Sequence, residues 1–253
     1  MTKQLLIYDR VVPLNRQVHR DTSVRKIASF AFAAEVNTVP IVDVEFARVA
    51  LEAPVVFART ETGLVSLALM GTAERKNAFV GPDMQWTGRY IPAFLRRYPF
   101  VFSVEQGTDR MTLCMDESFE GLNTENRGER MFDADGNPTT YLSTVLRFME
   151  DYQATFNRTQ AFCDRLEERD LLEEARIDYR LSDGTQGVVS GFLRVSAERL
   201  RALDDDVLGG MVRTGEMDLI QAHLLSLMNA ESLVTRSLAG VVVAAPDLEP
   251  AEV

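Results

Sequence analysis

Three arginines lie among large aromatic residues in one short stretch, Trp86–Phe102, with the sequence WTGRYIPAFLRRYPFVF. The stretch holds the only Trp of the chain and two of its 6 Tyr. A guanidinium group stacks on aromatic rings and forks onto carboxylate or phosphate groups. One interpretation is therefore a recognition surface for an anionic or planar ligand or for a partner chain, lined by Trp86, Arg89, Tyr90, Arg96, Arg97 and Tyr98.

The same spacing also fits a segment of the hydrophobic core, where aromatic rings bury large areas. Tyr90, Phe94 and Tyr98 recur at helical intervals. A short helix is expected to start near Pro92, because proline is tolerated in a first helical turn. It should end before Pro99, because the residue before a proline favours an extended backbone. Both interpretations stay open on the sequence alone.

Other chemistry has little support in the sequence. It contains no phosphate-binding loop, serine-hydrolase motif or zinc-protease motif. Of the two histidines, His19 is expected to be solvated in a polar loop, and His223 to lie at the apolar face of a helix. Cys114 and Cys163 are expected to be buried free thiols, because no zinc-ligand spacing joins them. We therefore expect no metal and no cofactor, and the catalytic residues of any enzymatic activity stay unknown.

Antiparallel hairpins are the elements that must position the aromatic–arginine stretch. Apolar, β-prone runs are joined in pairs by short turns that contain glycine, which predicts hairpins at residues 55–59 with 64–70, 100–105 with 110–116, and 177–181 with 186–195. The segment Asp116–Pro138 is rich in Gly, Asn and Asp, and we expect it to be a long loop. Long loops often carry function, so this segment is a second region for contacts with a partner.

Helices complete the predicted fold. Apolar residues at helical spacing predict one long helix or two in series over 141–174, capped by Thr139 or Thr140 and breaking near Arg169 and Asp170. Shorter helices are expected in 41–51, with Val44 on the apolar side and Glu45 on the polar side, and in 197–203, 204–212 and 216–228. The fold class is α+β, a mostly antiparallel sheet with a long helix and a C-terminal helical group. We expect one domain over residues 1–240, with a subdivision near residue 137 as the alternative, and a flexible acidic tail at 241–253.

The charge and the hydrophobicity of the chain limit the classes of partner that it can bind. The 253 residues carry a net charge of −11 and give a pI near 4.8. Nucleic-acid binding usually needs a basic face, so we expect no nucleic-acid partner. No apolar run approaches the roughly 20 residues of a membrane-spanning helix, and the N-terminal residues do not show the pattern of a secretory signal. We therefore expect a cytoplasmic protein without a membrane span.

Several stretches resemble one bacterial family. The run from Trp86 to Phe100 is similar to the signature of the SapC family, and three further stretches agree: FAFAAEVNTVPIVDVEF at 30–46, PVVF at 54–57, and residues 215–227. The resemblance covers roughly residues 1–235. It implies a soluble accessory protein in nutrient uptake or substrate modification, working with halogenase-like partners. It supplies no catalytic residue that could be transferred to this chain.

Three hypotheses about function follow. The first is a non-enzymatic accessory or binding protein that uses the aromatic–arginine stretch to hold a protein partner or a small anionic or aromatic ligand. The second is an enzyme on a small anionic or aromatic substrate, with the arginines as an anion clamp and His223 as the acid or base. The third is a surface-layer-associated protein. The sequence does not specify the oligomeric state.

Overall fold

The computed structural model describes residues 6–104, 111–180, 184 and 186–238. It is an α+β fold, as predicted from the sequence. The largest sheet has the strand order β10-β11-β4-β5-β3, formed by β3 (Thr38–Pro40), β4 (Val55–Thr60), β5 (Gly63–Leu69), β10 (Leu172–Arg180) and β11 (Gln186–Val195). Its neighbouring strands are all antiparallel.

Two smaller antiparallel sheets complete the β structure. One has the order β1-β7-β6, with β1 (Val11–Pro13), β6 (Phe100–Val104) and β7 (Met111–Asp116). The other has the order β8-β2-β9, with β2 (Ser23–Val24), β8 (Leu122–Asn123) and β9 (Glu129–Arg130). The prediction of one long loop over Asp116–Pro138 was therefore wrong, because two short strands of that segment pair with β2, about a hundred residues earlier in the chain.

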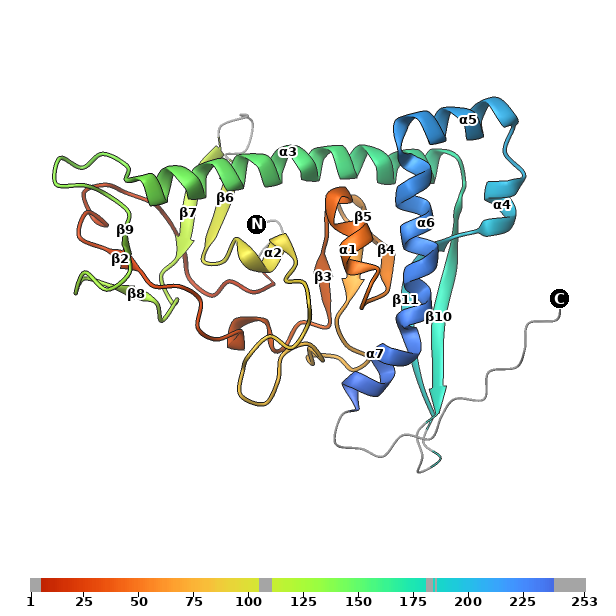
Figure 1. The fold of residues 1–253 in the computed structure, drawn as a ribbon, viewed down its shortest axis with the longest axis horizontal. Helices are drawn as coiled ribbons and strands as arrows, with labels where there is room; N and C mark the ends of the chain where they lie inside the picture. Colours follow the sequence, from red (N-terminus) through yellow and green to blue (C-terminus); the bar gives the residue numbers. More distant parts are fainter. Residues whose placement is uncertain (1–5, 105–110, 181–183, 185, 239–253) are drawn as a thin grey trace.

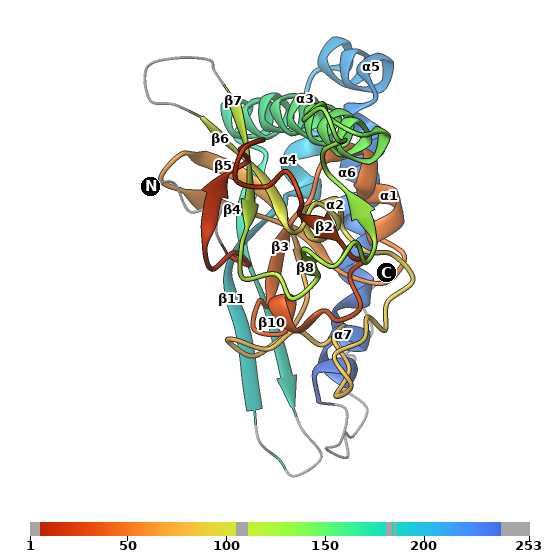
Figure 2. The same cartoon turned by 90° about the vertical axis from the view of Figure 1, so that its left-hand side faces the viewer.

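The three predicted hairpins are confirmed. β4 pairs with β5, β6 with β7, and β10 with β11. In the first hairpin Gly63 closes the turn with φ +120°, a conformation that side chains rarely permit. The β10–β11 hairpin extends away from the rest of the fold in both views (Figures 1 and 2). β11 reaches β4 only at Leu193 and Phe57, so most of its length pairs with β10 alone.

The long helix α3 (Thr140–Glu168) runs across the molecule and covers the ends of the sheets (Figure 1). Thr139 caps it, because its hydroxyl oxygen accepts a hydrogen bond from the Leu142 amide. The helix ends at Glu168, at the predicted break near Arg169 and Asp170, but no second helix follows, because β10 begins at Leu172. Asp170 adopts φ +51°, its amide binds the Glu167 carbonyl and the Leu171 amide binds the Leu166 carbonyl, which is a Schellman ending.

The remaining helices are short. They are η1 (Ala31–Ala33), η2 (Asp43–Glu45), α1 (Phe46–Val49), α2 (Ala93–Arg96), α4 (Ala197–Arg201), α5 (Asp205–Thr214), α6 (Glu216–Ser226), η3 (Leu227–Asn229) and α7 (Ala230–Ser237). α4, α5 and α6 form the predicted C-terminal group, and Gly215 separates the last two with φ +79°. α7 was not predicted. The acidic tail predicted at 241–253 lies outside the described residues.

The core lies where α1, α3 and α6 meet the largest sheet. Phe46, Phe57 and Phe162 are fully buried there and pack with ring centroids 6.1–6.4 Å apart. Aromatic pairs at such separations add to the free energy gained by burial. This packing fixes α1, which carries Arg48 of the surface described next. Within the described residues, no helix combines the length and the apolar composition needed to cross a membrane.

Candidate functional site

The aromatic–arginine stretch divides between core and surface. α2 lies within it, between Pro92 and Arg97, as predicted. Tyr98 is buried and stacks on Phe32 with centroids 4.0 Å apart. Arg89 and Arg96 are exposed, whereas Trp86 and Tyr90 are half-buried. The structure therefore brings together only part of the predicted recognition surface.

Two glutamates from the preceding helical segment hold the stretch in place. The Glu45 carboxylate is 1% exposed and accepts hydrogen bonds from the Tyr90 hydroxyl at 2.8 Å and the Ala93 amide at 2.6 Å. Its second oxygen accepts from the Val42 amide at 3.0 Å. Glu52 accepts from the amides of Arg89 and Tyr90, both at 2.8 Å. Both carboxylates are thus occupied by backbone amides and the tyrosine hydroxyl rather than by guanidinium groups.

Two arginines flank the Tyr90 ring. The guanidinium carbons of Arg48 and Arg96 lie 5.7 Å and 5.6 Å from its centroid, and that of Arg96 also lies 5.4 Å from the Phe148 ring. Arg96 donates to the Ile91 carbonyl and to the Tyr90 hydroxyl. These contacts hold the guanidinium groups in defined positions on the outside of the fold. Cation–π contacts of this kind are worth about 0.5–1 kcal/mol at exposed positions.

We call Arg48, Arg89, Tyr90 and Arg96 the arginine–tyrosine surface. Among the described residues, none of its three arginines forms an ion pair with a carboxylate. Burial, followed by the neighbouring Glu45 charge, raises the pKa of Tyr90 to about 12. The tyrosine is therefore a neutral hydroxyl at neutral pH, and the surface presents positive charge. Such a surface can bind carboxylate or phosphate groups through guanidinium hydrogen bonds.

Exposed apolar side chains adjoin the arginine–tyrosine surface. Val44 lies in η2, four residues before Arg48, and Leu51 lies in the turn that follows α1, three residues after Arg48; both are exposed. The Asn229 side chain binds the Ala50 carbonyl at 2.8 Å, which places η3 beside α1. Met228 in η3 is 80% exposed. We call Val44, Leu51 and Met228 the apolar margin; apolar groups beside charged ones are typical of protein-binding surfaces.

Trp86 holds the loop that carries Arg89. Its indole nitrogen donates to the Tyr90 carbonyl at 3.0 Å, and its ring stacks on Phe79 at 5.6 Å. Gly88 lies against these two rings. A Cβ atom at Gly88 would lie 2.8 Å from the indole nitrogen and 2.9 Å from Phe79 Cδ1. Trp86 thus fixes the backbone of the loop that carries Arg89 and Tyr90.

Gly88→Ala is expected to lower the free energy of unfolding by about 1–3 kcal/mol, because the added methyl group overpacks the contact between Trp86 and Phe79. Urea unfolding measures the change. Gly210→Ala on α5 is the matched control, since a Cβ there meets no atom within 4 Å. A Gly88→Ala protein as stable as the control would show that the loop is not held against Trp86.

Arg97 lies in the interior. It is 5% exposed, and its guanidinium carbon lies 4.3 Å from the Phe94 ring, 5.0 Å from Tyr152 and 5.7 Å from Tyr8. Its Nε and Nη2 atoms have no hydrogen-bond partner among the described residues. Aromatic faces therefore form much of its environment. A double substitution of Arg96 and Arg97 would combine a surface change with a core change, so the two must be tested separately.

The histidines do not supply an acid–base group to this surface. His223 is fully buried, accepts a hydrogen bond at Nε2 from the Val195 amide and contacts the Val55 carbonyl through Nδ1 at 2.8 Å. The prediction that His223 lies at the apolar face of a helix is confirmed, since it is buried in α6. The prediction of a solvated His19 was wrong, because His19 is buried and its Nδ1 accepts from the Asn15 amide.

The remaining polar chemistry is sparse. Cys114 and Cys163 are buried free thiols, as predicted, and burial raises the pKa of Cys163 to about 12. No group of three or more His, Cys, Asp or Glu residues that could hold a metal ion occurs within the described part of the chain.

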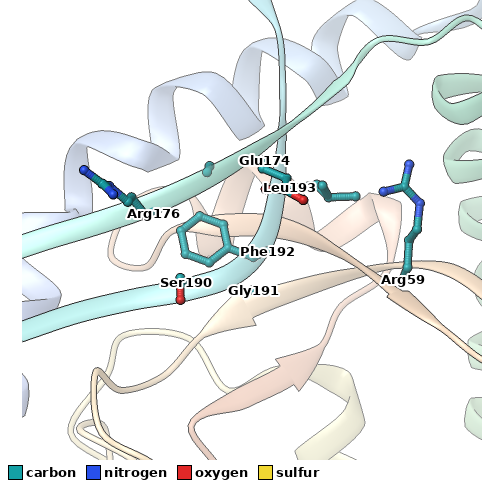
Figure 3. A pocket seen from close by; sticks show the side chains of 8 residues that line it. Arg59, Glu174, Arg176, Ser190, Gly191, Phe192 and Leu193 are labelled. Atoms are coloured by element: carbon teal, nitrogen blue, oxygen red, sulfur yellow. The ribbon is translucent and has the colours of Figure 1, made fainter.

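One surface cavity of about 640 Å³ lies at the base of the β10–β11 hairpin. Figure 3 shows Arg59 and Arg176 at opposite ends of it, with Phe192 between them. Arg59 pairs with Glu167 at 2.9 Å, and Arg176 pairs with Asp178 at 2.9 Å. Both cations are already neutralised within the fold, so we assign no ligand to this cavity.

Sequence reasoning missed Arg48 and the two glutamates of the site. The predicted helix in 41–51 placed Val44 on the apolar side and Glu45 on the polar side, and the structure reverses both: Val44 is exposed and Glu45 is buried. Two of the three hydrogen-bond donors to Glu45, the Tyr90 hydroxyl and the Ala93 amide, come from residues more than forty positions later in the chain. The sequence offered one signal for Arg48: it lies four residues after Val44 and three before Leu51, a spacing that would place all three on one side of the predicted helix in 41–51.

Comparison with known proteins gives one match. A family model described as SapC matches residues 14–233, which is most of the 253-residue chain. No curated protein and no solved structure matches the chain. The resemblance inferred from the aromatic–arginine stretch is confirmed. The chain belongs to the SapC family.

Proposed function

We propose that this chain is a non-enzymatic accessory protein that binds an acidic partner protein through the arginine–tyrosine surface and its apolar margin. The observation that carries the proposal is the set of three exposed arginines, two of them stacked on one tyrosine ring, without a carboxylate partner among the described residues. Ordered guanidinium groups of this kind are enriched in protein interfaces. The partner is expected to offer Asp or Glu side chains to them.

The charge of the chain favours a protein over a nucleic acid as the partner. The chain carries a net charge of −11, so a polyanion would be repelled by most of its surface. A small acidic patch on a folded protein, in contrast, can contact the arginines without approaching the acidic remainder of the surface. The apolar margin adds area that a highly charged backbone could not bury. Both features favour a folded acidic surface.

Three finer points belong to the proposal. The location is the cytoplasm, which is supported by two buried free thiols, since disulfides are rare in that compartment. The partner class is the halogenase-like protein that the family resemblance implies, and the process is nutrient uptake or substrate modification. The oligomeric state is open, and a second copy of this acidic chain is one outcome of the test below.

The test is comparative capture from the host. The tagged wild-type chain, the Arg48→Glu/Arg96→Glu variant and the control variant Arg16→Glu/Arg213→Glu are purified side by side, and the captured proteins are quantified by mass spectrometry. The control residues are exposed arginines without an ion pair among the described residues, and both variants change the net charge equally. The partner's affinity for each form is then measured with purified components at low and high salt.

We expect an acidic partner whose affinity falls about 100-fold in Arg48→Glu/Arg96→Glu, because opposed like charges cost several kcal/mol. The control variant should bind within about threefold of wild type, and added salt should weaken binding. A partner that binds both variants equally contradicts the proposal. So does a partner that is basic at the contact.

A further inference from the structure

A second, smaller cavity lies between the loop that follows β2, η1, and the turn between β7 and β8. Its volume is about 280 Å³. It is lined by Arg25, Lys26, Ala28, Ser29, Ala31, Phe32, Tyr98, Ser118, Phe119, Glu120 and Gly121. These residues come from segments far apart in the chain, and only Tyr98 belongs to the aromatic–arginine stretch. The arginine–tyrosine surface shares no residue with the cavity.

Aromatic rings form one side of the cavity. Phe32 and Tyr98 stack with centroids 4.0 Å apart and planes 12° apart. Phe119 meets Tyr98 edge-on at 5.4 Å and 83°. Burial, followed by the Asp116 charge, raises the pKa of Tyr98 to about 12, so its hydroxyl stays neutral at neutral pH. These rings offer a planar ligand both a ring face and ring edges.

Two cations also line the cavity. Arg25 and Lys26 are exposed, and neither forms an ion pair with a carboxylate among the residues that the structure describes. One Arg25 nitrogen, Nη2, donates to the Glu120 carbonyl at 3.0 Å, which fixes the guanidinium group near the cavity. Glu120 supplies the one carboxylate among the lining residues, and the two cations exceed its charge. The Asp116 carboxylate, whose charge also acts on Tyr98, already accepts hydrogen bonds from the amides of Asp9, Arg10 and Ser118 and from the Ser118 hydroxyl. The cavity therefore favours an anion.

The size of the cavity limits the ligand. Typical small-molecule sites have volumes of about 300–1,000 Å³, so this cavity is slightly smaller than the smallest of them. A nucleotide or a dinucleotide needs more room, whereas a molecule with one ring and one acidic group fits. Aromatic walls together with a fixed guanidinium group select a planar acid over an aliphatic one.

We propose that this cavity is a binding site for a small aromatic carboxylate. The ring of the ligand lies against Tyr98 and Phe119, and its carboxylate accepts hydrogen bonds from Arg25 and Lys26. The site adds a ligand to a chain whose proposed function is partner binding, and it uses different side chains. Its test can therefore fail without affecting the arginine–tyrosine surface.

The test uses 4-fluorobenzoate as the probe and fluorine NMR line broadening on the full chain as the measurement. Wild type should bind the probe saturably, and 4-fluorobenzamide, its neutral analogue, should bind about tenfold more weakly. Arg25→Ala should weaken 4-fluorobenzoate binding about tenfold by removing a charged hydrogen bond. Arg16→Ala is the matched control, an exposed arginine outside the cavity lining, and should bind as wild type does.

A second variant tests the cavity itself. Ala31 is exposed and lines the cavity, so Ala31→Phe should fill it and abolish binding while the chain stays folded. Circular dichroism checks the fold. No saturable binding by wild type overturns the proposal. So does equal binding of acid and amide, or binding in Arg25→Ala and Ala31→Phe that equals wild type.

Discussion

Replacing Glu45 by Ala is expected to lower the free energy of unfolding by about 4 kcal/mol. The carboxylate accepts hydrogen bonds from the Val42 amide, the Ala93 amide and the Tyr90 hydroxyl, and it is almost completely buried. Its removal leaves these donors without their acceptor, at a cost of about 1–3 kcal/mol for each one that water cannot reach. Urea unfolding at neutral pH measures the loss.

The same substitution should also disturb the arginine–tyrosine surface. The Glu45 carboxylate orients the Tyr90 ring, and Arg48 and Arg96 both stack on that ring. Partner affinity should therefore fall along with stability. Glu35→Ala is the control, because Glu35 is exposed and pairs with Arg75 at the surface; its effect should stay within about 0.5 kcal/mol. A loss below about 1 kcal/mol in Glu45→Ala would show that the carboxylate does not organise the site.

The second large effect is a loss of folding stability at acidic pH. Lowering the pH from about 6.5 to about 4 is expected to reduce the free energy of unfolding by about 3 kcal/mol through His223 alone. Burial lowers the pKa of His223 to about 4 in the folded chain, from an ordinary value of 6.5. Between these values the unfolded chain binds the proton and the folded chain does not. Stability is therefore fully present above about pH 6.5 and is lost as the pH falls through this window.

His223→Gln isolates this contribution. The glutamine side chain has one acceptor and one donor group for Val195 and Val55, and it does not titrate. The variant should be less stable than wild type near neutral pH and should lose less stability between about pH 6.5 and about pH 4. Urea unfolding across this range tests it. An acid response of His223→Gln as steep as that of wild type would assign the pH dependence to other groups.

Elements that depend on residues close together in the sequence were predicted correctly, whereas features that depend on distant residues were not. The hairpins depend on local turns, such as that at Gly63, and alternation of β-prone residues reveals them. The break of α3 near Arg169 and Asp170 was predicted correctly, whereas the helical spacing that continues to residue 174 belongs to β10. Burial of Glu45 depends on donors from a distant segment, so no local pattern could indicate it.

The candidate site shows the same limit. Of the residues predicted to line a recognition surface, the structure places Arg89, Tyr90 and Arg96 together near the surface. Arg97 is adjacent to Arg96 in sequence, yet it points into the core, because successive helical residues face different directions. Arg48 joins the site only through the packing of α1 beside the loop that Glu52 holds. Composition could not distinguish the buried arginine from the exposed ones.

The central claim is that an acidic partner covers the arginine–tyrosine surface, and arginine footprinting tests it most directly. Phenylglyoxal, which modifies exposed guanidinium groups, is applied to the free chain and to the captured complex, and mass spectrometry quantifies each arginine. The account predicts that Arg48, Arg89 and Arg96 react in the free chain and are protected in the complex, while Arg16 and Arg213 react equally in both. Unchanged reactivity of Arg48 and Arg96 in a complex that protects other arginines would contradict it.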